Sequence, residues 1–272
     1  MFTPSPEPFI VSLCSAPMRD NQLGHQMAVM QAFLEAAHGS QLLCFGESFL
    51  QGFEGLTWDY ATDRERAIRM DGSQMEAIRE LARRFRRGLS FGFIELFEDM
   101  LYSSNIVLDS EGNTVDLFRR VSVGWKEHSI TGPEYREGPG FHGFELQGAR
   151  TVTAICGDLW YTENLAEIKA LEPQVLLWPL YVDYAAHGWE GETRAEYAEQ
   201  AAGLGCPVLM INSLVDDPQR AKGGAVVFNG GGVLAELPMG QTGMLSFDLH
   251  ALIADPLSCR FERQLLDLSQ LS

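Results

Sequence analysis

The stretch that decides the fold is TVTAICGDLWYTEN, residues 151–164. Its apolar and β-branched run VTAI leads directly into Cys156, and a glycine and an aspartate follow the cysteine. This pattern predicts a buried strand that delivers a thiol to a tight turn, with a helix starting just beyond. A cysteine at the rim of a sheet lies beside the free backbone N–H groups of the turn. Those are the conditions for a nucleophile rather than for core packing.

Length and composition indicate a soluble globular chain. The 272 residues are 46% hydrophobic and 21% charged, which is ordinary for a domain with a sizeable core. No run approaches about 18 apolar residues, so we expect no membrane-spanning helix. The first residues have no basic start and do not resemble a signal peptide, which predicts a cytoplasmic location.

Charge and cysteine content argue against several classes of partner. The formal net charge is −17 and is spread along the chain, whereas nucleic acids and anionic membranes are bound by basic surfaces. We therefore expect no nucleic acid and no membrane partner. The five cysteines (Cys14, Cys44, Cys156, Cys206 and Cys259) are widely spaced and form no CxxC pair. This spacing predicts free thiols in a reducing compartment and no zinc site.

Helical patterns and short apolar runs alternate along the rest of the chain. Apolar residues recur at helical spacing in four stretches. These stretches are residues 20–39, 73–87, 162–171 and 189–204. Ser73 followed by Glu76 predicts a capping box that opens the second helix.

The apolar runs between the helices predict strands, and two pairs of them predict hairpins. The first hairpin turns at residues 110–113 and the second at the glycine run 230–232. No linker, repeat or low-complexity tract interrupts the pattern. The sequence therefore predicts one layered α/β domain over residues 1–272, built on a mixed sheet or on two sheets.

Polar side chains stand where three predicted strands end. Glu47 follows LLCFG, Cys156 follows TVTAI and Asn212 follows VLMI. Ligands bind at strand ends in α/β sheets, so we expect a site there. A fourth polar position is Lys126, in the loop predicted over residues 125–140, where VGWKEHS offers a partly apolar setting for an amine.

Five segments, taken in order, resemble the nitrilase, or carbon–nitrogen hydrolase, superfamily. They are LLCFGESFLQGF (42–53), SSNIVLDSEGNTVDLFRR (103–120), ICGDLWYTENL (155–165), RAEYAEQAAGLGCPVLMINSLV (194–215) and GGAVVFNGGGVLAEL (223–237). Each segment alone is a weak signal, but the ordered set spans roughly residues 9–250. The resemblance implies a four-layer α–β–β–α sandwich, a homodimer that pairs through the helical layers, and no cofactor. No Asp, Glu and His cluster in the sequence has metal-ligand spacing, so we expect no metal.

The resemblance also implies a Glu–Lys–Cys triad. Glu47 falls on the general base and Cys156 on the nucleophile. Gly46 stands where a proline is usual. Counting from Gly112 puts the triad lysine at Arg120, whereas Lys126 lies six residues later. We favour Lys126 as the cation that stabilises the oxyanion, because a compact ammonium suits a crowded site, and Arg120 is the alternative.

Further site residues follow from the same resemblance. Family members often carry a second glutamate in the loop after the lysine, and Glu134 is the first candidate. Glu127 and Glu137 stay open as alternatives. Substrate contacts are expected from Asp158 and Trp160, which follow the cysteine, and from Tyr181 and Asp183, which follow the strand VLLWPL.

The activity that the resemblance implies is hydrolysis of a non-peptide C–N bond in a small molecule. An amide or an N-carbamoyl group is the expected substrate, cleaved through a thioester on Cys156. Two alternatives stay open. One is a non-catalytic binding or regulatory relative, and the other is an acyltransferase that passes the acyl group to an amine.

Overall fold

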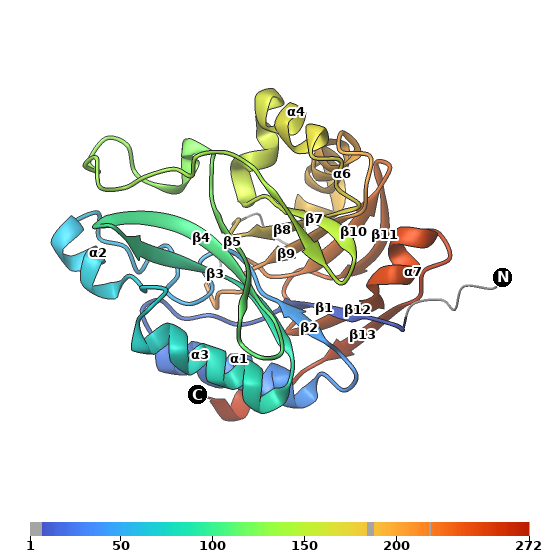
Figure 1. The fold of residues 1–272 in the computed structure, drawn as a ribbon, viewed down its shortest axis with the longest axis horizontal. Helices are drawn as coiled ribbons and strands as arrows, with labels where there is room; N and C mark the ends of the chain where they lie inside the picture. The colour runs from blue at the N-terminus through green and yellow to red at the C-terminus, as the bar shows by residue number, and fades with distance from the viewer. Residues whose placement is uncertain (1–6, 184–187, 218, 272) are drawn as a thin grey trace.

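The computed structural model describes residues 7–183, 188–217 and 219–271, and it contains two β-sheets packed face to face (Figure 1). Within these residues the first sheet has seven strands and the second has six. The first contains, in spatial order, β13 (Phe261–Leu265), β12 (Gly243–Asp248), β1 (Ile10–Ser15), β2 (Leu42–Cys44), β3 (Gly88–Phe97), β4 (Met100–Leu108) and β5 (Thr114–Arg119). The second contains β11 (Gly232–Leu237), β10 (Ala225–Asn229), β9 (Val208–Asn212), β8 (Val175–Leu180), β7 (Ala149–Thr153) and β6 (Gly143–Leu146).

Helices cover the outer faces of both sheets. In Figure 1 the helices α1 (Leu23–Ala36) and α3 (Ser73–Phe85) lie below the first sheet, and α4 (Thr162–Ala170) and α6 (Arg194–Ala202) lie above the second. The shorter elements are α2 (Tyr60–Arg66), α7 (Leu249–Ala254), the single turns η1 (Val123–Trp125), η2 (Cys156–Trp160) and η4 (Ser269–Leu271), and the wide turn η3 (Trp189–Thr193). In the described part of the chain, no helix is both long and apolar enough to cross a membrane.

Three separate apolar cores define the layering. One lies between the sheets, where Leu13 and Leu42 meet Leu177 and Leu209. A second packs α1 and α3 on the first sheet, and a third packs α4 and α6 on the second sheet. The predicted four-layer α–β–β–α sandwich is therefore confirmed.

Strands β1, β2 and β3 run parallel to one another, as do β7, β8 and β9. Such strands are buried on both faces and read as continuous apolar runs. In β2, for example, Leu42 and Cys44 contribute to the core between the sheets and Leu43 to the helix-covered core. Because β2 and β7 each end in a turn that carries a polar side chain, Glu47 and Cys156 meet at the same edge of the sandwich.

Most predicted elements are confirmed, and some details differ. Both hairpins form, as β4–β5 and β10–β11. The predicted capping box does not form: Gly72 occupies the N-cap without a side-chain hydrogen bond, Ser73 is already helical, and Glu76 pairs with Arg83 instead. The short elements α2, α7, β6 and β13 had no counterpart in the prediction, because their sequences carry no clear periodicity.

Candidate active site

Glu47 is a fully buried carboxylate in the turn that follows β2. Its Oε1 accepts hydrogen bonds from Oγ of Ser103 and Nη1 of Arg120, both at 3.0 Å. The second oxygen, Oε2, accepts no hydrogen bond from the described residues. Burial raises the pKa of Glu47, and the charge and hydrogen bond of Arg120 partly offset this rise. A carboxylate with a raised pKa and a free oxygen is suited to act as a general base.

Arg120 follows β5 and supplies the cation beside Glu47. Because side chains alternate along a strand, Arg119 points to one side and pairs with Glu95, while Arg120 points to the other. Its Nε donates to Oγ of Ser122 at 2.8 Å and its Nη1 to Glu47. Its Nη2 lies against the cysteine turn, 2.6 Å from where a Cβ atom on Gly157 would be.

Cys156 opens the turn η2 with a φ of 44°, a left-handed conformation that is uncommon for a residue with a side chain. Its carbonyl accepts the indole N–H of Trp178 at 2.9 Å. Burial and the neighbouring charge of Glu47 raise the pKa of the thiol to about 12, although Arg120 acts in the opposite direction. The raised pKa favours the protonated thiol, and Glu47 is the neighbouring carboxyl group that could accept its proton.

Asp158 anchors the turn that carries Cys156. Its buried carboxylate accepts the backbone N–H groups of Ile155 at 2.8 Å, Val121 at 3.1 Å and Ser122 at 2.6 Å. Asp158 thereby ties the cysteine turn to the segment that follows Arg120. Asp158 does not line the cavity above Cys156, and both of its oxygens accept backbone N–H groups.

A cavity of about 300 Å³ opens above the thiol. Arg120, Gly124 and Cys156 line it together with Phe53, Trp58, Trp125, Lys126, Glu127 and Tyr181. Four of these side chains are aromatic. Phe53, Trp58 and Trp125 were not predicted as site residues, although Phe53 closes LLCFGESFLQGF and Trp125 stands beside Lys126 in VGWKEHS.

Lys126 lines this cavity but does not contact Glu47. Its Nζ donates to the carbonyl of Tyr135 at 2.5 Å and forms an ion pair with Glu137 at 2.7 Å. The structure thus places Arg120, the alternative for the oxyanion cation, beside Glu47, and it places Lys126, the favoured candidate, in the wall of the cavity. The physical reason is strand alternation, which aims Arg120 inward, whereas Lys126 lies beyond the turn η1 in the cavity wall.

The candidate second glutamates occupy different places. Glu137 pairs with Lys126, and Glu127 lies at the cavity rim with its carboxylate bound to Ser129. Glu134, the first candidate, does not line the cavity; its carbonyl accepts the N–H of Leu101 at 2.8 Å.

Of the remaining residues predicted from the sequence, some line the cavity and others lie outside it. Tyr181 lines the cavity, and its hydroxyl accepts a hydrogen bond from Arg220 at 3.0 Å. Trp160 is 41% exposed, packs edge-on against Tyr197 and lies outside the cavity. Asp183 is also exposed and outside it. Asn212 bonds both backbone groups of Val182, so it holds the chain after β8.

The described residues hold no group of three or more His, Cys, Asp and Glu side chains arranged for a metal ion. The site consists of a thiol, a carboxylate, a guanidinium and an aromatic wall. This set can activate a sulfur nucleophile and stabilise a developing oxyanion.

Two proteins with related sequences are a nitrilase and a cyanide hydratase. The chain is 28% identical over 226 residues to the bromoxynil-specific nitrilase of Klebsiella pneumoniae subsp. ozaenae, which covers 79% of this chain and 57% of that protein. It is 25% identical over 216 residues to the cyanide hydratase of Microdochium sorghi, which covers 73% of this chain and 57% of that protein. The chain thus spans little more than half the length of these relatives.

Solved structures share the fold at lower identity. One is a mutant of the amidase from Nesterenkonia sp. AN1, which superposes on this chain with a TM-score of 0.71 at 18% identity and 96% coverage of both chains. In that structure the acetamide moiety of fluoroacetamide is added covalently at the active-site cysteine. A glutamine-dependent NAD+ synthetase from Acinetobacter baumannii superposes with a TM-score of 0.74 at 16% identity, covering 96% of this chain and 48% of that one.

The sequence also matches a family-wide pattern, described as carbon-nitrogen hydrolase, over residues 10–257. This match covers nearly the whole two-sheet domain and includes Glu47, Arg120 and Cys156. The chain therefore belongs to the carbon-nitrogen hydrolase family.

Proposed function

We propose that this protein hydrolyses a C–N bond in a small molecule, an amide or an N-carbamoyl compound, through a thioester on Cys156. The observation that carries the proposal is the ion pair of Glu47 and Arg120 beside Cys156 on the floor of a small cavity. Family membership supports the reaction class, and the amidase with a modified active-site cysteine supports a small amide as substrate.

The first half-reaction acylates the enzyme. Glu47 accepts the thiol proton of Cys156 as the sulfur attacks the carbonyl carbon. The oxyanion of the tetrahedral intermediate accepts hydrogen bonds from Nη2 of Arg120 and from the backbone N–H of Gly157. Losing one donor of this kind costs about 10²–10³ in rate. Glu47 then gives its proton to the leaving nitrogen, the C–N bond breaks, and the amine or ammonia departs.

The second half-reaction releases the acyl group. Glu47 takes a proton from a water molecule, whose oxygen attacks the thioester carbon. The C–S bond breaks, the acid leaves, and the proton on Glu47 returns to the sulfur. An arginine is adequate here because the oxyanion needs positive charge and directed N–H groups, not a cation that can lose its proton.

The test is turnover together with a trapped intermediate. The purified protein is offered a panel of amides, N-carbamoyl amino acids and nitriles, and ammonia release is measured. Intact-mass spectrometry then detects the acyl adduct, which Cys156→Ala should not form. If no compound is turned over and none leaves an adduct on Cys156, the protein is a non-catalytic relative and the proposal fails.

Two variants test the choice of cation. Arg120→Ala should lower kcat by about 10²–10³, because it removes the oxyanion donor. Lys126→Met should change kcat far less, because Lys126 belongs to the wall. The opposite pattern would return the cation role to Lys126. An adduct that is released only when an amine is added would identify an acyltransferase.

The expected homodimer and the cytoplasmic location stay predictions of the sequence. Size-exclusion chromatography with light scattering measures the first directly.

A further inference from the structure

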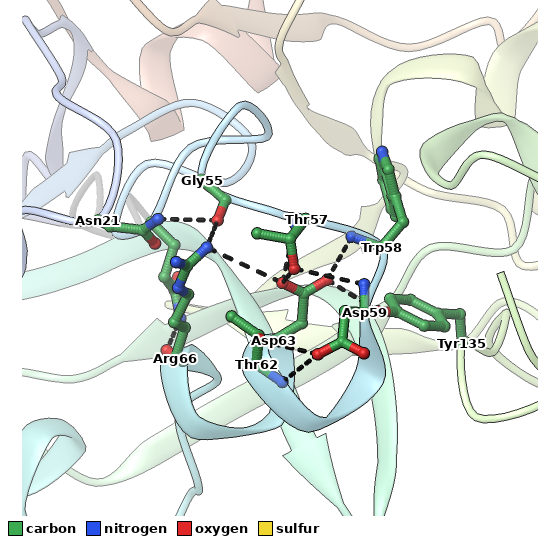
Figure 2. A network of polar contacts seen from close by, with 10 residues as sticks. Asn21, Gly55, Thr57, Trp58, Asp59, Thr62, Asp63, Arg66 and Tyr135 are labelled. Atoms are coloured by element: carbon green, nitrogen blue, oxygen red, sulfur yellow. Dashed lines mark hydrogen bonds and ion pairs between the residues drawn. The ribbon is translucent and has the colours of Figure 1, made fainter. Parts of the chain in front are cut away.

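Asp63 is a buried carboxylate that the proposed reaction does not use. It lies in α2 and is 0% exposed, at the centre of the network in Figure 2. Its Oδ1 accepts the N–H and the hydroxyl of Thr57, both at 2.8 Å. Its Oδ2 accepts the N–H of Trp58 at 3.0 Å and the hydroxyl of Tyr135 at 2.7 Å. One carboxylate therefore joins two loops that are far apart in the sequence.

The first loop carries Trp58 into the wall of the cavity above Cys156. Trp58 has a φ of 62°, which is uncommon for a residue with a large side chain. Its hydrogen bond to Asp63 supports this backbone conformation. The direction of the indole ring thus depends on the buried carboxylate behind it.

The second loop reaches the same wall through Tyr135, which is itself only 1% exposed. The Tyr135 ring packs against Trp58 at 5.9 Å and Trp125 at 6.1 Å between ring centroids. Its carbonyl accepts the ammonium of Lys126 at 2.5 Å. Tyr135 therefore backs three side chains that line the cavity, although it does not line the cavity itself.

The backbone around Tyr135 is held independently of its hydroxyl. Leu101 in β4 donates to the carbonyl of Glu134 and accepts the N–H of Arg136, both at 2.8 Å. Removing the hydroxyl therefore leaves the loop attached to the sheet. What it removes is the link between the loop and Asp63.

We propose that Asp63 and Tyr135 are positioning residues for substrate binding: their hydrogen bond sets Trp58, Trp125 and Lys126 as one wall of the cavity and thereby determines which substrates fit above Cys156. This inference rests on the proposed function for its kinetic test. It concerns the binding step and leaves the groups that carry out bond cleavage untouched.

The experiment compares two tyrosine variants. Tyr135→Phe removes one hydrogen bond to a buried charge, and we expect KM to rise about tenfold while kcat stays within about twofold. Tyr60→Phe is the control for loss of a tyrosine hydroxyl, because Tyr60 donates an exposed hydrogen bond to the carbonyl of Asp99 at 2.6 Å and lies outside the cavity. Its KM should not change. Asp63→Asn should also raise KM. It replaces Tyr135→Phe in the experiment if that variant does not fold.

A purely structural role would give a different result. It would lower the amount of active enzyme, and so the apparent kcat, while KM stayed constant. That pattern, or an equal rise of KM in Tyr60→Phe, would overturn the proposal.

A second measurement separates this inference from the proposed function. Peptide mass spectrometry measures the rates at which iodoacetamide and the bulkier N-phenylmaleimide alkylate Cys156. These two alkylation reactions do not require that the enzyme turn over a substrate. In Tyr135→Phe the ratio of the two rates should shift by about threefold or more, since the wall is no longer fixed. An unchanged ratio would contradict the positioning role even if hydrolysis is found. A shifted ratio without hydrolysis would support it while the proposed function fails.

Discussion

The guanidinium of Arg120 occupies the space that a side chain at position 157 would need. A Cβ atom on Gly157 would lie 2.6 Å from Nη2 of Arg120. Gly157 directly follows Cys156, so the nitrogen that we assign to the oxyanion lies against the backbone of the nucleophile turn. In this chain the large guanidinium of Arg120 is thus accommodated by the absence of a side chain at the residue after the cysteine.

This accommodation predicts a coupling between two substitutions. Gly157→Ala should displace the guanidinium by several tenths of an ångström and lower kcat/KM by about 10–100-fold, because small misplacements of a catalytic group are costly. In an Arg120→Lys background the same alanine should cost less than about twofold, because the lysine does not fill that space. A double-mutant cycle on kcat/KM measures the coupling.

If turnover of Arg120→Lys is too slow to measure, the alkylation rate of Cys156 replaces kcat/KM as the quantity measured in the double-mutant cycle. Equal losses from Gly157→Ala in both backgrounds would show that the contact with Arg120 has no catalytic consequence.

The sequence reveals the strands well because their signal is local. Runs such as VTAI and VLMI are buried on both faces, and a polar residue at the end of such a run marks the sheet edge. Glu47 and Cys156 could be placed at strand ends on this basis, whereas the four-layer sandwich was implied by the resemblance to the carbon–nitrogen hydrolase superfamily. The short helix α2 could not be foreseen, since YATDRER has no apolar face.

The preference for Lys126 relied on chemical type and not on strand geometry, which places Arg120 beside Glu47. Phe118 and Arg120 share one face of β5 and its extension, and Phe118 is buried in the core under α4 and α6. The alternation of Phe118, Arg119 and Arg120 was therefore a usable signal for an inward arginine. Asp158 could not be assigned from sequence, because its partners are backbone N–H groups that only the folded turn brings together.

The pH dependence of the reaction should follow from Glu47. Its pKa is raised above the ordinary value of 4.5, so it becomes protonated, and unable to accept the thiol proton, at a higher pH than an exposed glutamate. We therefore expect the acid limb of kcat/KM to lie above pH 4.5, with activity lost as the pH falls through the raised pKa. Rates measured between about pH 4 and 10 test this.

The thiol should not contribute a limb in the neutral range. Burial raises the pKa of Cys156 to about 12, so the thiol stays protonated in the free enzyme. Ultraviolet titration of the wild type against Cys156→Ser should show no thiolate step near neutrality. A thiolate that forms near pH 7 would mean that the sulfur is ionised before substrate binds, and would remove the need for Glu47 as the acylation base.

Asp158 should be far more important for stability than an exposed aspartate with similar bonds. Asp158→Ala leaves the N–H groups of Ile155, Val121 and Ser122 buried without their acceptor, which should cost about 3–4 kcal/mol of unfolding free energy. Urea denaturation measures the change.

Asp109 is the matched control for this experiment. It also accepts backbone N–H groups, those of Glu111 and Asn113 at 2.8 Å, but in an exposed hairpin turn where water can replace it. Asp109→Ala should therefore cost only about 1 kcal/mol. Equal costs at the two positions would show that burial of the nucleophile turn adds nothing to its stability.

Gly46 should resist substitution, including by the proline that is usual in the family. A Cβ atom at this position would lie 2.5 Å from Oγ and 2.6 Å from the backbone nitrogen of Ser213, and 2.9 Å from the carbonyl oxygen of Leu180. Both neighbours also bind Glu47: Leu180 accepts its N–H at 3.1 Å, and Ser213 donates to its carbonyl at 3.0 Å. Gly46→Ala should therefore cost about 2–3 kcal/mol and most of the activity, since it displaces the segment that holds the base.

Two comparisons make the Gly46 result interpretable. Gly24→Ala adds a Cβ to a helix position with no atom within 4 Å, and it should be neutral or slightly stabilising. Ser213→Gly removes only the hydroxyl part of the clash, so it should rescue Gly46→Ala incompletely, because the backbone nitrogen stays in place. Full rescue of both stability and kcat would show that the hydroxyl alone excludes a side chain at position 46, and that a proline could be restored by that one further change.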